Sequence, residues 1–382
     1  FKWFRKIRYK SKRNMKICIL KEKRINEKRT PLVPLDIKKI LSKYPNWIFY
    51  IEPSKSRIIS DNEFYKVGCK KYSSQKIDLF LSIKEVSINK IIKNNNYLMF
   101  SHTIKGQNHN LSLLKTFLNK NASLLDYELL KNNKKIRAIG FGWYAGVMGT
   151  YLTILKLLNQ KFVYKPNLKI VDLIKHLKSI KIENFKILIT GDGLVSKGSQ
   201  YLLEKLQIKN RGKGKNQPYY KVLLPHKFYK RTDRKFNYRD LLNGEGSYKS
   251  NFKQYIGKFD AYLACHYWDD RFPKLFDLSD INKNSFQIIG DITCDIDGSV
   301  PTTIKSTNLK KPFYRYKNTT IMSVDNLPSG LPYDSSKYFS KRLRLLLPKI
   351  VNSLDKDSIE EYFITKKGYL NYRYLNLLNK LI

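Results

Sequence analysis

The feature that most constrains the fold is a series of short, almost continuous apolar runs, each closed by polar residues. Two of them lie close together in the first third of the chain, at residues 79–83 and 97–100, and they are followed by Lys84 and His102. Apolar runs without polar alternation are typical of strands buried on both faces of a parallel sheet. Because these runs alternate with stretches of helical apolar spacing, the sequence predicts an α/β architecture.

Similar patterns recur along the whole chain. Pro34 is placed to begin a helix, and Asp61 is predicted to cap another, with Tyr65 and Val67 facing inward. A chain of 382 residues is too long for most single hydrophobic cores, so we expect two domains. We expect the last helix to return to the first of these domains. Further strands are predicted at residues 15–20, 47–52, 122–125, 186–190, 261–268, 287–295 and 321–328, and helices at 35–44, 111–118, 147–158, 199–206 and 338–350.

The formal net charge of +43 is the unusual feature of the composition. Taken alone it would suggest a nucleic-acid or anionic-membrane partner. The Lys and Arg residues are spread along the chain, however, and they accompany many Asn, Ile, Tyr and Phe residues and only 18 Gly. A genome rich in A/T codons explains this pattern, and no nucleic-acid-binding motif is visible, so we predict neither nucleic acid nor membrane as a partner.

The cysteines and the first residues of the chain give indications of its cellular compartment. Cys18, Cys69, Cys265 and Cys294 are widely spaced, without a CxxC pair or a Cys/His cluster, which predicts a reduced cytoplasmic protein and no metal site. Apolar runs long enough for a membrane helix or a signal peptide are lacking. Residues 1–14 form a basic extension, and we expect the initiator at Met15.

Polar residues at the strand ends are the first candidates for chemistry. In open α/β sheets the ligand crevice lies outside the carboxyl ends of the strands, so Lys84, His102 and Lys105 are expected along one rim. Histidine titrates near neutrality, and a lysine can act as a base when its surroundings lower its pKa. Arg29, on the loop after the first strand, could grip a carboxylate with two hydrogen bonds.

A glycine-rich turn follows the strand at residues 186–190. Gly191 and Gly193 stand before a helix, an arrangement that lets a backbone approach a pyrophosphate at a helix N-terminus, although Ser196 occupies the place of the usual third glycine. The acid expected about twenty residues later for a ribose hydroxyl is absent from residues 219–231. Cations stand there instead, which favours NADP over NAD.

Nine segments together carry a family resemblance. In chain order they are KEKRINEKRTPLVP, EPSKSRIISDNEFYKVG, LSIKE, FSHTIKGQ, LDYELL, FGWYAGVMG, ITGDGLVSKG, CDIDGS and SVDNLPSGLP. From about Met15 to near the C-terminus the chain resembles the lysine-forming saccharopine dehydrogenases and the lysine-2-oxoglutarate reductase half of bifunctional lysine-degrading enzymes. These lie within the alanine dehydrogenase/transhydrogenase-like superfamily.

The resemblance implies two doubly wound Rossmann-like domains with a cleft between them. Residues 15–150 and 328–382 would form the catalytic domain, completed by the C-terminal segment, and residues 151–327 the nicotinamide-dinucleotide domain. The implied reaction interconverts saccharopine with L-lysine and 2-oxoglutarate by hydride transfer with NAD or NADP. Lys84 and His102 match the acid–base positions, Arg29, Lys105, Gln107 and Arg137 the substrate contacts, and Gly191, Gly193, Leu194, Val195, Cys265, Ile292, Val324, Asp325, Asn326 and Leu327 the cofactor contacts.

Two alternatives stay open at the level of the sequence. Alanine dehydrogenases share the start of the pattern, the Lys-Glu pair after a strand and a following histidine, and they would perform reductive amination of pyruvate. A degraded, non-catalytic relative would tolerate the loss of the third glycine. The ribose acid of the NAD-specific fungal type is also absent, which leaves the cofactor, like the oligomeric state, undecided.

Overall fold

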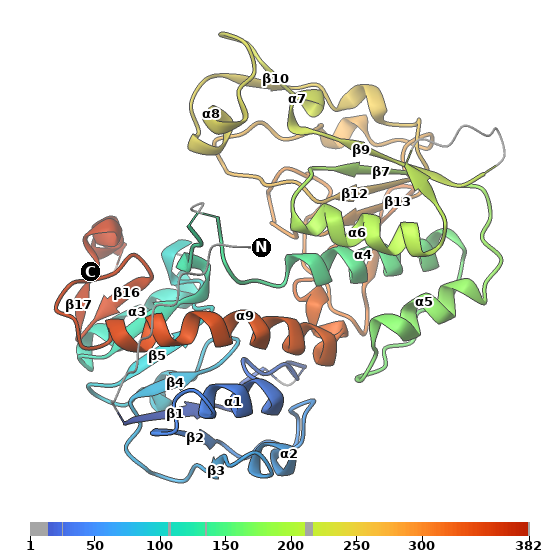
Figure 1. Ribbon diagram of the computed structural model, residues 1–382. Coiled ribbons are helices and arrows are strands. Elements are labelled where there is room, and N and C mark those ends of the chain that lie inside the picture. The colour runs from blue at the N-terminus through green and yellow to red at the C-terminus, as the bar shows by residue number, and fades with distance from the viewer. Residues whose placement is uncertain (1–13, 25, 106–107, 134–135, 211–216, 381–382) are drawn as a thin grey trace. The chain divides into compact units, whose positions relative to one another are not determined.

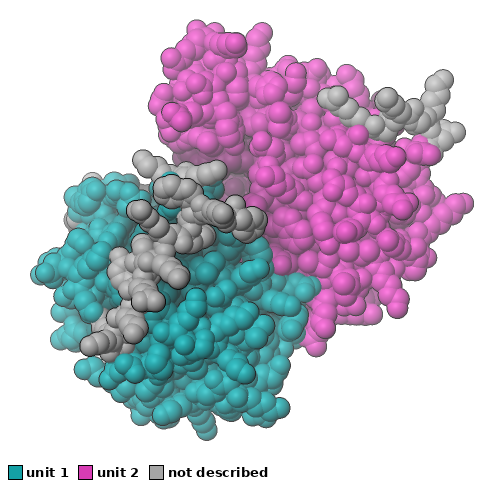
Figure 2. Space-filling view, viewed as in Figure 1, with its two compact units in different colours: residues 1–140, 332–382 teal, residues 141–331 magenta. Residues whose placement is uncertain are grey.

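The computed structural model describes residues 14–24, 26–105, 108–133, 136–210 and 217–380, and it divides the chain into two compact units (Figure 2). The first unit comprises residues 1–140 and 332–382, and the second comprises residues 141–331. The expected boundary at residue 150 falls inside helix α4 (Gly142–Leu157), which lies wholly in the second unit. Each unit is a sheet flanked by helices, so the predicted α/β class with two Rossmann-like halves is confirmed.

An eight-stranded sheet forms the centre of the first unit (Figure 1). Its order is β17-β16-β6-β5-β4-β1-β2-β3, and the six strands from β6 to β3 are parallel. Their buried apolar residues produce the continuous runs seen in the sequence. The strands are β1 (Met15–Ile19), β2 (Trp47–Ile51), β3 (Lys70–Lys71), β4 (Leu79–Leu81), β5 (Asn96–Met99), β6 (Ser123–Asp126), β16 (Phe363–Lys366) and β17 (Tyr369–Leu370).

The C-terminal segment completes this unit, as predicted. Strand β16 pairs antiparallel with β6, and Ser336 and Ser340 of helix α9 accept the amides of Thr30 and Val33 at 3.0 and 2.9 Å. Val33 is the N-cap of α1, so Ser340 satisfies an amide that the helix itself cannot, and Ser336 binds the loop that precedes the helix. The helices of this unit are α1 (Pro34–Leu41), α2 (Asp61–Tyr65), α3 (Asn108–Asn119) and α9 (Pro332–Ser353), with short 3₁₀ turns η1 (Ile88–Lys90), η2 (Thr103–Lys105), η3 (Tyr127–Leu129) and η7 (Tyr372–Lys380).

Helix α2 differs from its prediction at the N-terminus. Ser60 is the N-cap and forms a capping box with Glu63, whereas Asp61 pairs with Arg57 at 2.5 Å. Phe64 is the residue that α2 buries, while Tyr65 and Val67 are only half-buried. The prediction was wrong because Ser60 and Asp61 are both good caps, and the glutamate three residues after Ser60 decides between them.

The second unit contains a seven-stranded sheet of order β14-β15-β13-β12-β7-β9-β8, parallel except for the edge strand β14. The strands are β7 (Lys186–Thr190), β8 (Lys209–Asn210), β9 (Tyr219–Leu223), β12 (Ala261–Ala264), β13 (Ile288–Asp291), β14 (Phe313–Tyr316) and β15 (Thr319–Met322), with a separate hairpin of β10 (Tyr229–Arg231) and β11 (Tyr248–Ser250). Besides α4, its helices are α5 (Ile170–Lys178), α6 (Leu194–Lys205), α7 (Pro225–Phe228) and α8 (Tyr238–Asn243), with 3₁₀ turns η4 (Lys253–Tyr255), η5 (Leu278–Asp280) and η6 (Leu327–Gly330).

Helices α4 and α6 lie side by side over this sheet (Figure 1). Their contact depends on glycines, because a Cβ on Gly146 would overlap the carbonyl of Val195, and a Cβ on Gly198 would overlap that of Trp143. Helix α6 begins at Leu194, five residues before the predicted start at residue 199. Its first turn therefore lies directly after the glycine-rich loop.

Candidate active site

The predicted rim exists in the first unit. Strands β4 and β5 are parallel neighbours, with Phe80 opposite Tyr97 and Leu81 opposite Leu98. Lys84 follows β4 and His102 follows β5, so both residues leave the sheet at its carboxyl edge. The sequence placed this pair correctly at the ends of adjacent strands.

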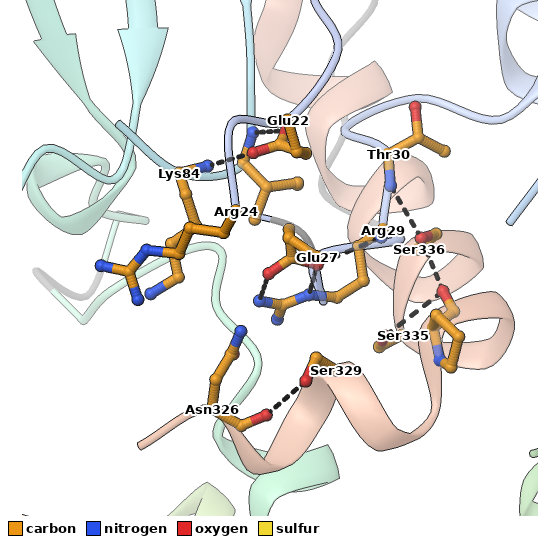
Figure 3. A network of polar contacts seen from close by, with 12 residues as sticks. Glu22, Arg24, Glu27, Arg29, Thr30, Lys84, Asn326, Ser329, Ser335 and Ser336 are labelled. Atoms are coloured by element: carbon orange, nitrogen blue, oxygen red, sulfur yellow. Dashed lines mark hydrogen bonds and ion pairs between the residues drawn. The ribbon is translucent and has the colours of Figure 1, made fainter. Parts of the chain in front are cut away.

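Glu22 fixes the backbone at Lys84 (Figure 3). Its carboxylate follows β1 and accepts the amide of Ile83 at 2.6 Å and that of Lys84 at 3.0 Å. Burial and the neighbouring charge of Glu27 raise the pKa of Glu22 above its ordinary value, although the two amides oppose that rise. The loop that carries Lys84 is thereby tied to the end of the neighbouring strand.

Glu85 orients His102. The ring Nδ1 lies 2.5 Å from Glu85 Oε1, and Arg24 Nη2 lies 3.3 Å from Glu85 Oε2. Burial would raise the pKa of Glu85, but the hydrogen bond and charge of His102, together with Arg24, lower it to about 2. His102 also has a φ of 53°, a left-handed conformation that is uncommon outside glycine and frequent at functional sites.

Asp126 holds the chain just before His102. It accepts the amide and the hydroxyl of Ser101 at 2.9 and 2.6 Å, and also the amide of Glu128 at 2.8 Å. Burial raises the pKa of Asp126 to about 6, even though the Ser101 hydrogen bond lowers it. The strained backbone of His102 therefore has a buried anchor on one side and Glu85 on the other.

Arg29 is buried and paired. Its Nε and Nη2 atoms contact the two carboxylate oxygens of Glu27 at 2.7 and 2.5 Å, and both side chains are almost fully buried (Figure 3). The sequence predicted this guanidinium as a grip for a substrate carboxylate. In the structure Glu27 occupies that bidentate edge, so a substrate would have to displace it or use another edge of the guanidinium.

Two of the three remaining predicted substrate contacts, Lys105 and Arg137, come after strands β5 and β6 in the sequence. Arg137 follows β6, is half exposed, and lies 3.6 Å from Glu128. The backbone of Lys105 belongs to turn η2. Gln107 lies outside the described residues.

Four acidic residues of this site were missed by the sequence analysis: Glu22, Glu27, Glu85 and Asp126. Two of them, Glu85 and Asp126, belong to the polar residues that close the apolar runs of β4 and β6. An acid directly after a buried strand was the available indication, because such an acid lies at the same edge as the predicted catalytic pair. The partner of each acid comes from elsewhere in the fold and could not be assigned.

A second candidate site lies at the carboxyl edge of the sheet in the second unit. After β7, Gly191 adopts a φ of 89°, and a Cβ there would overlap the backbone of His266. Gly193 is the N-cap of α6, and a Cβ there would meet no atom within 4 Å. The open space at this helix N-terminus suits a pyrophosphate, which the helix dipole and free amides favour.

The other predicted cofactor residues occupy neighbouring strand ends of the same unit. Cys265 follows β12 and Ile292 follows β13, and both are buried. Burial raises the pKa of the Cys265 thiol to about 12, so this cysteine is no thiolate. Leu194 and Val195 open α6, whereas Val324, Asp325, Asn326 and Leu327 follow β15.

The cationic residues after β9 differ in whether they could contact a cofactor phosphate. Arg231 is buried and pairs with Asp233 at 2.8 Å and with Asp240 at 2.5 Å. It therefore serves the hairpin and is no candidate for a cofactor phosphate. Lys227 and Lys230 are exposed. Among the residues described, no helix is long and apolar enough to cross a membrane.

Comparison with known proteins places the chain in a family. Residues 18–148 match the N-terminal domain of alanine dehydrogenase/PNT, and residues 247–372 match the C-terminal domain of alanine dehydrogenase/PNT. These two matches together take in more than half of the chain. The chain belongs to the alanine dehydrogenase/PNT family of oxidoreductases.

Curated relatives of this family member agree with the resemblance seen in the sequence. Alpha-aminoadipic semialdehyde synthase of Arabidopsis thaliana is 26% identical, covering 91% of this chain and 39% of the relative. Saccharopine dehydrogenase (NAD(+), L-lysine-forming) of Yarrowia lipolytica is 23% identical, covering 90% of this chain and 94% of the relative. The chain thus spans about two fifths of the Arabidopsis protein. A solved L-alanine dehydrogenase has the same fold, with a TM-score of 0.65, 13% identity and coverage of 96% of this chain and 100% of that chain.

Proposed function

We propose that this protein interconverts saccharopine with L-lysine and 2-oxoglutarate, with a nicotinamide dinucleotide as the redox partner. The observation that carries the proposal is the pair Lys84 and His102 on adjacent strand ends, each held by a buried or half-buried carboxylate. The names of the curated relatives support the substrate. The family supports the nicotinamide cofactor.

The reaction needs proton transfers before and after the redox step. The ε-amine of lysine attacks the keto carbon of 2-oxoglutarate, and a proton must leave nitrogen and reach oxygen before water departs. His102 suits this task because Glu85 binds Nδ1, which leaves Nε2 as the atom that exchanges a proton with substrate. Lys84 is the second proton-transfer group, on a loop that Glu22 holds in place.

The substrate brings several carboxylates, and cations on the first unit would bind them. Arg137 is exposed and accessible for this purpose, and Lys105 and Gln107, which follow β5 in the sequence, would contribute further polar groups. Arg29 would contribute after exchanging part of its contact with Glu27. Bidentate pairing makes arginine well suited to carboxylates.

Residues of the second unit would hold the cofactor. Gly191, Gly193 and the N-terminus of α6 would receive the pyrophosphate, with Cys265, Ile292 and residues 324–327 around the rest of the dinucleotide. When bound, the nicotinamide ring accepts or supplies the hydride. Exposed Lys227 and Lys230 favour NADP, and the proposal is that NADPH binds more tightly than NADH.

Absorbance at 340 nm tests the reaction directly. Purified protein is given NADPH or NADH with lysine and 2-oxoglutarate, and pyruvate with ammonia serves as the parallel substrate pair. We expect oxidation only when lysine and 2-oxoglutarate are both present. Removing a general acid–base group typically costs 10²–10⁴-fold, so Lys84→Met and His102→Gln should lose about that much activity.

Exposed residues of the same type provide the controls. Lys38→Met on α1 and His176→Gln on α5 make the same chemical changes away from the carboxyl ends of the strands, and both should keep wild-type rates. Turnover with pyruvate and ammonia alone would move the protein to alanine dehydrogenase activity. Silence with every substrate pair in a folded protein would contradict the proposal.

A further inference from the structure

One feature of the first unit without an assigned role is a cavity of about 860 Å³ at the carboxyl ends of β1, β2 and β4. Its volume lies in the range of small-molecule sites. Five cationic side chains line it: Lys21, Lys23, Arg24, Lys55 and Lys90. Four of these come from two sequence segments, residues 21–24 and 53–56. Within these segments, only Glu22 and Arg24 have a part in the proposed reaction.

The acids near this cavity are already compensated. Asp61 accepts Arg57 Nη1 at 2.5 Å and the amide of Ser54 at 2.9 Å. Glu52 accepts Lys90 Nζ at 2.5 Å and the amide of Lys21 at 2.9 Å. The negative charge of Asp61 and Glu52 is thus directed to these partners, and it does not neutralise the other cations of the cavity. Glu22 also lines the cavity, and its carboxylate accepts the amides of Ile83 and Lys84.

Three of the cations have no such compensation. Over the described part of the chain, the side chains of Lys21, Lys23 and Lys55 make no hydrogen bond or ion pair, and all three residues are exposed. Ser54 and Ser56 add hydroxyls on the same wall, with their oxygens 3.1 Å apart. Ammonium and hydroxyl groups together suit oxyanions, which accept hydrogen bonds from both.

We propose that this cavity binds a small molecule that carries two or more oxyanion groups, either carboxylates or phosphates. Two groups are favoured because the uncompensated lysines come from two segments, the end of β1 and the loop after β2. A single small anion would gain little from an exposed lysine alone. A ligand that bridges the two segments gains several charge-assisted contacts at once.

The cavity is connected to the proposed catalytic pair. Arg24 lines the cavity, and its Nη2 lies 3.3 Å from Glu85, which in turn binds His102. An oxyanion that contacts Arg24 competes with Glu85 for the guanidinium and so changes the charge around the carboxylate that orients His102. This link rests on the proposed function, whereas the binding site itself does not.

Lysine is abundant throughout this chain, so the test must separate a built site from general attraction. Isothermal titration calorimetry on the full chain at fixed ionic strength uses citrate and tripolyphosphate as probes, with acetate and inorganic phosphate as single-group probes. The test variant is Lys21→Gln with Lys55→Gln. The control variant is Lys38→Gln with Lys39→Gln, which removes the same charge from exposed positions on α1.

We expect at least one multivalent probe to bind the wild type with one equivalent per chain, and acetate and phosphate to bind at least about tenfold more weakly. The test variant should weaken binding of that probe by about tenfold or more, which corresponds to about 1.4 kcal/mol, and the control variant should change it less than about twofold. Tighter binding of citrate identifies a polycarboxylate ligand, and tighter binding of tripolyphosphate a phosphorylated one.

Three results would overturn the proposal. They are the absence of binding by both multivalent probes, equal loss in the two variants, or equal affinity for single-group and multivalent probes, the last meaning an adventitious ion only. Melting temperatures of the variants confirm that both remain folded. Calorimetry needs no turnover, so failure of this site and failure of the saccharopine reaction are observed separately.

Discussion

At the scale of single residues, the site depends on carboxylates that position catalytic groups. Glu85 is the clearest case, because one oxygen contacts the ring of His102 and the other contacts Arg24. His102 also has a left-handed φ, and such a conformation needs contacts like this one to hold it in place. A residue held in the left-handed region persists only when its surroundings fix it.

Replacing Glu85 should therefore affect both rate and stability. We expect Glu85→Gln to lower kcat more than it raises KM for lysine, and to lower the free energy of unfolding at pH 6 by about 2 kcal/mol. The folded-state pKa of Glu85 is lowered to about 2 from 4.5. Its stabilising contribution is therefore present above about pH 4.5 and is lost as the pH falls toward 2.

Urea unfolding between pH 6 and pH 3.5 measures this dependence. The difference between wild type and Glu85→Gln should shrink as the pH falls through this range. Glu183→Gln, an exposed change of the same charge, should give a small difference at every pH. A stability difference for Glu85→Gln that does not depend on pH would mean that the carboxylate charge is not what stabilises this loop.

At the scale of elements, two glycines of the α6 region have different tasks. A Cβ on Gly193 meets no atom, and its φ of −73° is open to any residue, whereas a Cβ on Gly198 would overlap the backbone of α4. We expect Gly198→Ala to destabilise the second unit by about 1–3 kcal/mol through overpacking. Gly193→Ala should leave stability within about 0.5 kcal/mol.

The same two variants test the proposed cofactor site. Titration of NADPH fluorescence should show about tenfold weaker binding to Gly193→Ala, because the new methyl group enters the space proposed for the pyrophosphate. Gly198→Ala should bind NADPH nearly as wild type under conditions where it is folded. Normal NADPH affinity in Gly193→Ala would place the pyrophosphate elsewhere.

A buried lysine fastens the C-terminal elements together. Lys366 of β16 donates to the carbonyls of Ser353 and Ser358 at 3.0 and 2.8 Å, and also to that of Lys356. These carbonyls lie at the C-terminal end of α9 and just after it, and Lys366→Met would leave them without their charged donor. We expect a loss of about 2–3 kcal/mol in urea unfolding, and less than about 0.5 kcal/mol for the exposed Lys349→Met.

Some of these elements could be predicted from the sequence and others could not, for physical reasons. The strands were predictable because parallel strands buried on both faces need continuous apolar residues, and Lys84 and His102 followed from the strand ends. The start of α6 was not predictable, because Gly193 precedes the helix without a side chain that could cap it. Glu22 could not be paired with Ile83 or Lys84, since 61 and 62 residues separate it from them and only the strand order brings them together.

At the scale of the whole molecule, the two units differ in how the chain builds them. Residues 141–331 form the second unit as one continuous segment with its own seven-stranded sheet. The first unit is discontinuous and depends on α9 and β16. Phe339 of α9 packs against Phe100 and Tyr127 with ring centroids 5.9 and 4.9 Å apart, so a fragment that ends at residue 140 would expose these rings.

We therefore expect the two segments to behave differently when produced separately. Residues 141–331 should fold in one cooperative transition and bind NADPH, because their core and proposed pyrophosphate site lie within one segment. Residues 1–140 should show no cooperative transition by circular dichroism until residues 332–382 are joined to them through a flexible linker. A folded 1–140 fragment would show that α9 and β16 cover a core that is already formed, and Lys366→Met should then cost far less than predicted.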